Sequence, residues 1–82
     1  MQNNIESARS LLAGIASYKV SDGLHDLVDT EVIYRCKVLS VLPDLSAEHV
    51  KTLLDDCVYS SLCNDFTIVV LDAAWNLLKT DH

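Results

Sequence analysis

The chain has 82 residues, so we expect a single domain over residues 1–82 with one modest hydrophobic core. Twelve acidic residues against six Lys and Arg give a formal net charge of −6, and this balance speaks against nucleic-acid binding, because phosphate recognition needs clusters of basic side chains. Half of the residues are hydrophobic, but no apolar stretch reaches the ~18 residues that a membrane-spanning helix needs.

The N-terminal sequence MQNNIESARS has no basic start followed by an apolar run, so it does not read as a secretory signal. The chain has an odd number of cysteines and no CxxC motif, and the three are Cys36, Cys57 and Cys63. We therefore expect a cytoplasmic protein whose thiols are reduced and buried.

Only two Gly and one Pro occur in the chain, which favours helices over short strands joined by tight turns. The predicted fold class is all-α, a small bundle of four or five helices with short connections. A first helix is predicted over 5–18, where apolar side chains recur every three or four positions and Asn3 or Asn4 can cap the start. Within it, Gly14 either lets another helix approach closely or is tolerated at a cost of about 1 kcal/mol relative to Ala.

The segment 24–42 allows more than one interpretation. As a helix it has one broad apolar face made of Leu24, Leu27, Val28, Tyr34, Val38, Val41 and Leu42. As a strand it would use the run VIYRCKVLSVL, which is rich in residues that favour strands. The helix is preferred because a lone strand has no partner, and a break near Asp29 and Thr30 would divide it into two helices. Pro43 ends the segment.

The residues after Pro43 give the clearest helix start in the chain. Ser46 is the N-cap, and Leu45 and Val50 stand at the spacing of a hydrophobic staple. His49 lies in the first turn and is expected to be neutral and exposed, because a charged imidazolium would oppose the helix dipole. The pattern continues to a break at 60–65.

The last helix, capped by Asn64 or Asp65, carries more apolar surface than one helix face needs. One apolar stripe consists of Phe66, Val69, Val70, Ala73 and Leu77. We predict that the second stripe binds a partner, and it consists of Ile68, Leu71, Trp75 and Leu78. Trp75 is the candidate anchor, and the sequence leaves open whether it lies in this interface or in the domain's own core.

No set of residues supports catalysis. The cysteines lie at or beside apolar helical positions, and no Gly-rich loop is present to hold nucleotide phosphates. His25 lies among Asp22, Asp26 and Asp29, a cluster that is more typical of a solvated acidic face than of a metal site. We therefore predict no catalytic, cofactor-binding or metal-binding residue, and expect that the protein is not an enzyme.

The expected function is a non-enzymatic protein-binding module, a small acidic adaptor or a chaperone that shields a helical client through its apolar C-terminal helix. An acidic face would speed up the encounter with a basic client, and it consists of Asp22, Asp26, Asp29, Asp55 and Asp56. The partner is another protein or a second copy in a homodimer, which would also cover the spare apolar surface. The alternative is an inhibitor or immunity-type protein that covers a basic site on a nucleic-acid enzyme with this acidic face.

Overall fold

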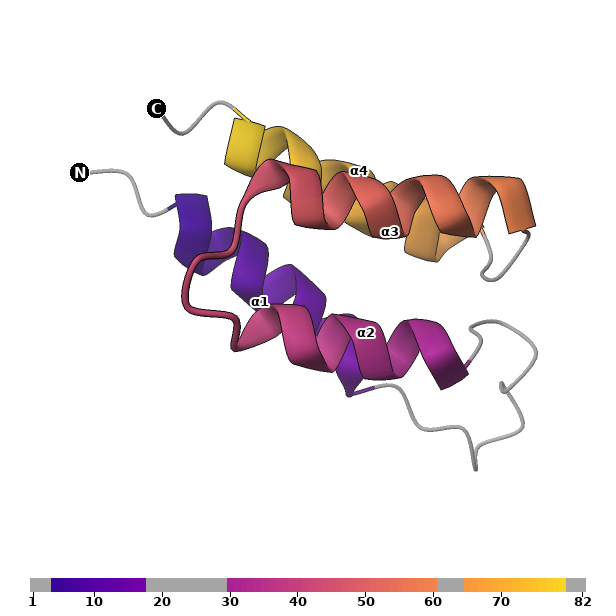
Figure 1. Ribbon diagram of the computed structural model, residues 1–82, viewed down its shortest axis with the longest axis horizontal. Helices are drawn as coiled ribbons and strands as arrows, with labels where there is room; N and C mark the ends of the chain where they lie inside the picture. The colour runs from indigo at the N-terminus through magenta and orange to yellow at the C-terminus, as the bar shows by residue number, and fades with distance from the viewer. Residues whose placement is uncertain (1–3, 18–29, 61–64, 80–82) are drawn as a thin grey trace.

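The computed structural model describes residues 4–17, 30–60 and 65–79 (Figure 1). They form four helices, α1 (Asn4–Ala16), α2 (Thr30–Ser40), α3 (Ala47–Ser60) and α4 (Asp65–Lys79). These ranges contain no strand, so the all-α prediction is confirmed for them and the strand interpretation of 32–42 is wrong. Residues 24–29, and with them the question of a further helix before α2, lie outside the described residues.

Local signals explain where these helices begin and end. α2 ends at Ser40, three residues before Pro43. The backbone N–H of Ser46 donates to His49 Nδ1 at 3.1 Å, so His49 fills the reciprocal position of a capping box at the start of α3. Leu45 and Val50 are both buried in one core cluster, as a hydrophobic staple requires.

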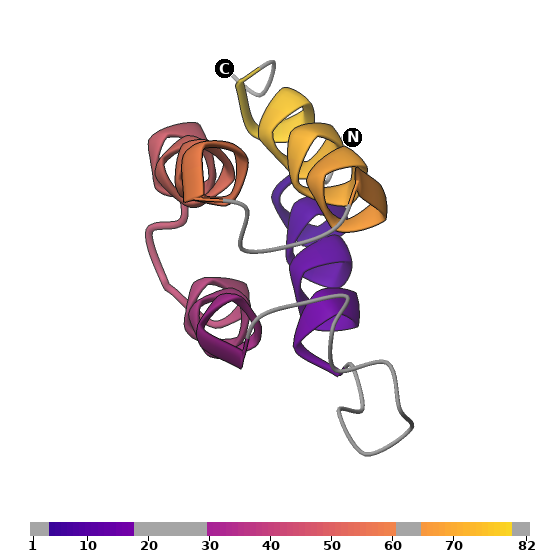
Figure 2. The same ribbon diagram turned by 90° about the vertical axis from the view of Figure 1, so that its right-hand side faces the viewer.

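The four helices lie in two layers, with α2 and α3 in one and α1 and α4 in the other (Figure 2). α1 packs against α2 and α4, and α3 packs against α4. α2 and α3 run side by side, joined by residues 41–46, but they touch one another least among these pairs (Figure 1).

All four helices contribute to a single core. Its buried members are Ala8, Leu12, Ile15, Val32, Cys36, Leu45, Val50, Leu53, Leu54, Cys57, Leu71, Ala74 and Leu78. The prediction of buried thiols is confirmed for Cys36 and Cys57, whereas Cys63 lies outside the described residues. Nothing lies within 4 Å of the position that a Cβ on Gly14 would occupy, so this glycine does not mark a close helix approach within the described structure.

The buried face of α2 differs from the one that the sequence predicted. Val32 and Cys36 are fully buried, whereas Tyr34, Val38 and Val41 of the predicted apolar face are 67%, 41% and 74% exposed. The prediction was wrong because α2 carries two apolar stripes at helical spacing, and only one of them faces α1. None of the four described helices combines the length and the apolar character that crossing a bilayer requires.

Candidate functional site

The face of α4 that was predicted to bind a partner lies largely inside the domain. Leu71 is fully buried and Leu78 is 6% exposed, while Ile68 and Trp75 are partly buried and pack against the core. This placement corrects the prediction that Leu71 and Leu78 lie on a docking surface. The physical reason is that α4 packs against both α1 and α3, and two neighbouring helices cover a wide arc of its circumference.

Trp75 is held by contacts within the domain. Lys79 Nζ lies 3.9 Å and Lys51 Nζ 5.2 Å from the centroid of its ring, both within the range of a cation–π interaction. Lys51 also donates to Asp55 Oδ1 at 2.6 Å, and this hydrogen bond raises the pKa of Lys51. The structure thus places Trp75 at the edge of the core, stacked under basic side chains of α3 and α4.

The spare apolar surface predicted for α4 is present on part of the other stripe, because Val70 and Leu77 of that stripe are partly buried and pack against the core. Phe66 is 65% exposed and Val69 is 64% exposed, and Ala73 of the same stripe is also exposed. These residues face away from the core, since the stripe with Leu71 is the one that packs inward.

The predicted acidic face is only partly described. Asp22, Asp26 and Asp29 lie outside the described residues, as does His25. Asp55 pairs with Lys51, and Asp56 Oδ2 accepts a hydrogen bond from Arg35 Nη1 at 2.9 Å. In the described part of the chain, no group of three or more His, Cys, Asp or Glu side chains is arranged to hold a metal ion.

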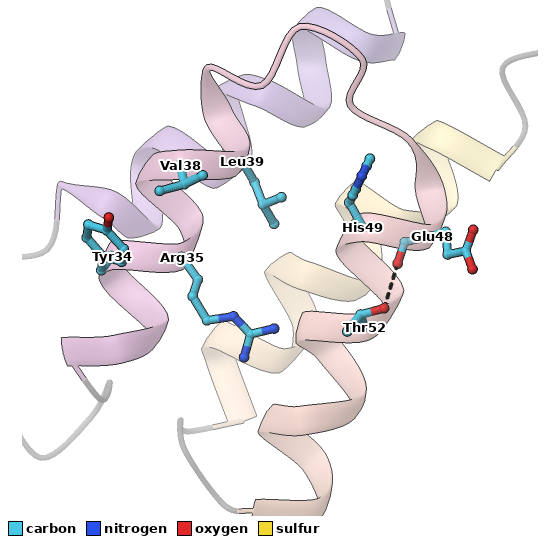
Figure 3. A pocket seen from close by; sticks show the side chains of 7 residues that line it. All are labelled: Tyr34, Arg35, Val38, Leu39, Glu48, His49 and Thr52. Atoms are coloured by element: carbon cyan, nitrogen blue, oxygen red, sulfur yellow. Dashed lines mark hydrogen bonds between the residues drawn. The ribbon is translucent and has the colours of Figure 1, made fainter.

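A cleft between α2 and α3 has a volume of about 500 Å³ (Figure 3). It is lined by Tyr34, Arg35, Val38 and Leu39 of α2 and by Glu48, His49 and Thr52 of α3. The cleft exists because α2 and α3 pack on the second layer more than on each other. Its α2 wall is mainly apolar and its α3 wall is polar.

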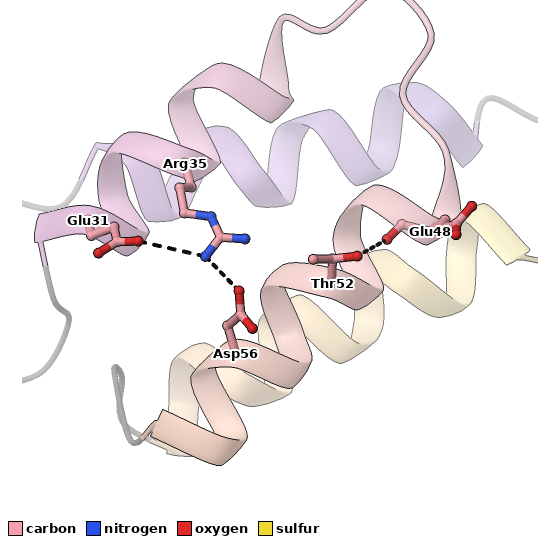
Figure 4. A network of polar contacts seen from close by, with 5 residues as sticks. All are labelled: Glu31, Arg35, Glu48, Thr52 and Asp56. Atoms are coloured by element: carbon pink, nitrogen blue, oxygen red, sulfur yellow. Dashed lines mark hydrogen bonds and ion pairs between the residues drawn. The ribbon is translucent and has the colours of Figure 1, made fainter.

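Arg35 bridges the two walls (Figure 4). Its Nη1 lies 2.9 Å from Asp56 Oδ2 on α3 and 3.9 Å from Glu31 Oε2 one turn earlier on α2. The side chain of Arg35 is 29% exposed, that of Asp56 is 50% exposed and that of Glu31 is 64% exposed. Water therefore screens this network only in part. The ion pair ties α2 to α3 where the two helices have few other contacts.

The α3 wall is ordered by local hydrogen bonds. Thr52 Oγ1 donates to the backbone oxygen of Glu48 at 3.0 Å (Figure 3). His49 Nδ1 accepts from the Ser46 N–H, and a nitrogen that accepts carries no proton, so Nε2 is the donor nitrogen of the ring. His49 is exposed, as the sequence predicted.

Sequence reasoning did not find this cleft. It placed Tyr34 and Val38 on the apolar face of 24–42, and it used α3 for a helix start and for the acidic residues Asp55 and Asp56. One signal was available, because α2 has more apolar positions than a single contact face needs. The sequence analysis recognised such an excess in the last helix but not in α2.

No protein-family model matches this chain, no curated protein is significantly similar to it in sequence, and no solved structure is significantly similar to it. The functional argument therefore depends on the geometry and chemistry of the cleft.

Proposed function

We propose that this small helical bundle is a non-enzymatic protein-binding module, an adaptor or chaperone, that holds an α-helix of another protein in the cleft between α2 and α3. The observation that carries the proposal is the exposure of Tyr34 and Val38, at 67% and 41%, in the wall of a cleft of about 500 Å³.

The shape of the cleft favours a helix as the occupant. The cleft lies between two helices, α2 and α3, and each contributes lining residues that are about one turn apart. The α3 residues that line the cleft run from Glu48 to Thr52, which is about 6 Å or one turn of a helix. Tyr34 and Val38 stand one turn apart on α2 and both line the cleft, which suits apolar anchors at matching positions of a partner.

The other partner proposals have less support. The inhibitor alternative needs an acidic face that is available to a basic site, but Asp55 and Asp56 already pair with Lys51 and Arg35. Self-association would cover the outer stripe of α4 around Val69 rather than the cleft. We further propose a cytoplasmic location, which the buried thiol of Cys36 supports because buried reduced cysteines are typical of that compartment.

The test is a titration with a synthetic amphipathic peptide of about 18 residues, long enough to form a helix, with Leu on one face and uncharged Gln and Ala on the other. Binding is followed by the backbone amide NMR shifts of the protein. We expect the shifts to concentrate on Tyr34, Val38 and Thr52, which lie on the two walls of the cleft.

Two matched variants make the test specific. Val38→Glu puts a charge into the cleft and should weaken binding about tenfold or more, which corresponds to ~1.4 kcal/mol. Val69→Glu adds the same charge to an equally apolar, exposed site on the opposite layer and should leave the affinity within about twofold. The proposal is refuted if the peptide does not bind at millimolar concentration, or if Val69→Glu weakens binding as much as Val38→Glu does.

A further inference from the structure

We propose that His49 makes the start of α3 a pH-sensitive switch, which is closed at neutral pH and open at mildly acidic pH. His49 is the third residue of α3, and Ser46 lies directly before the helix as its N-cap. His49 also belongs to the α3 wall of the cleft, so the switch changes that wall as well (Figure 3). The switch does not depend on which molecule occupies the cleft.

The closed state depends on one unprotonated ring nitrogen. Nδ1 of His49 lies 3.1 Å from the backbone nitrogen of Ser46 and 3.0 Å from the Ser46 hydroxyl oxygen, and both groups donate to it in the closed state. In an ordinary capping box, a Glu or Gln at this position accepts from the same backbone N–H. A neutral imidazole takes that place here, and imidazole is the only one of these three groups that ordinarily changes its charge between about pH 8 and pH 5.

Protonation opens the cap for two physical reasons. A protonated Nδ1 is a donor, so it no longer accepts from the Ser46 N–H. The Ser46 hydroxyl can rotate and accept instead, but the backbone N–H cannot reverse its role and must turn to water. The charged ring also lies in the first turn of α3, where the helix dipole disfavours a cation. Because the proton and the closed cap exclude each other, the stability of the fold decreases as the pH falls through this range.

The charges around His49 come from three helices and the loop before α3. The titratable and charged residues in that loop, in the cleft and in the hollow at the start of α3 are Tyr34, Arg35, Asp44, Glu48 and Lys79. Two of them are carboxylates, which favour a charged ring, and two are cations, which disfavour it. Since these effects oppose each other, the lost hydrogen bond and the helix dipole decide the direction of the pH dependence.

The matched variant is His49→Gln, because a Gln at this position offers a neutral acceptor at every pH. Thermal unfolding of both proteins is followed by circular dichroism at about pH 7.5 and about pH 5.5, within the range where imidazole changes its charge. Between these two conditions the Tm of the wild-type protein should fall by about 4–8 °C more than that of His49→Gln, as expected for the loss of one helix cap in a domain of this size. The other two histidines, His25 and His82, are present in both proteins, so the difference isolates His49.

NMR of the wild-type protein tests the switch without a substitution. At about pH 7.5 the ring ¹⁵N shifts of His49 should place the proton on Nε2, because Nδ1 accepts from Ser46. When the pH is lowered, the backbone amide resonance of Ser46 should move together with the ring resonances of His49. The protection of this amide against hydrogen exchange should fall about threefold or more, because the amide loses its acceptor.

Three results would overturn the inference. It is wrong if the fall in Tm differs by less than about 2 °C between the wild-type protein and His49→Gln. It is also wrong if the ring proton lies on Nδ1 at neutral pH, or if the Ser46 amide does not respond while the His49 ring takes up its proton. If His49→Gln does not fold, the two NMR measurements on the wild-type protein decide the question.

Discussion

Arg35 should stabilise the fold mainly by tying α2 to α3 across the cleft. Its Nη1 lies 2.9 Å from Asp56 Oδ2, and the two side chains are 29% and 50% exposed. At this distance Coulomb's law gives about 1.4 kcal/mol in bulk water and several times more at a lower effective dielectric constant. Ordering the two side chains opposes this gain, and exposed pairs contribute roughly 0.2–1 kcal/mol. We therefore expect a coupling energy at the upper end of that range, about 1 kcal/mol.

A double-mutant cycle measures this coupling. Arg35→Gln, Asp56→Asn and the double variant are unfolded by heat and by urea, with the helical signal in circular dichroism as the readout. A loss of about 1 kcal/mol should lower the Tm by roughly 4–8 °C in a domain of this size. The coupling should weaken in about 1 M salt, where the Debye length is only ~3 Å.

Lys37→Gln provides the control, because it removes the same charge from an exposed position on the same helix. We expect it to change the free energy of unfolding by less than about 0.5 kcal/mol. The reasoning is refuted if Arg35 and Asp56 show a coupling below about 0.2 kcal/mol at low salt, or if Lys37→Gln costs as much as Arg35→Gln.

Three further predictions test the core and the helices. Gly14→Ala should raise the free energy of unfolding by about 0.5–1 kcal/mol, measured by urea unfolding, because a Cβ there meets open space and Ala favours the helix. Leu53→Ala should cost about 2–5 kcal/mol by leaving a cavity in the core, whereas Val58→Ala at a half-exposed site should cost less than about 1 kcal/mol. Burial raises the pKa of the Cys36 thiol from 9.0 to about 12, so below pH 9 the thiol is protonated in both states and its contribution to stability is complete. Between about pH 9 and pH 12 the Cys36 thiol ionises in the unfolded chain before it ionises in the folded protein. The free energy of unfolding, measured in urea, should therefore fall as the pH rises through this range, and the fall should be smaller in Cys36→Val than in the wild-type protein.

The helices and their ends could be predicted because the signals for them are local. The start of α3 follows from Ser46 and the staple formed by Leu45 and Val50, and the end of α2 follows from Pro43. A capping hydrogen bond or a proline clash involves residues within a single turn, so its outcome depends little on the rest of the fold.

The faces of the helices were predicted less well. In α4 the sequence identified two apolar stripes correctly, but it assigned the inward stripe, with Leu71, to a partner. In α2 it placed Tyr34 and Val38 on the main apolar face, but the structure exposes both and buries Val32 together with Cys36, whose burial was predicted. The periodicity of a helix shows that an apolar stripe exists, but not which neighbouring helix covers it.

The sequence by itself determined that this chain forms helices, where α2 ends and α3 starts, and that it has more apolar surface than one small core uses. The tertiary structure alone decided that α4 lies between α1 and α3, and that α2 and α3 stay far enough apart to leave a cleft. The reason is that helix formation depends on contacts within a few residues, whereas the choice of buried stripe depends on side chains that are distant in the sequence and meet only in the packed core.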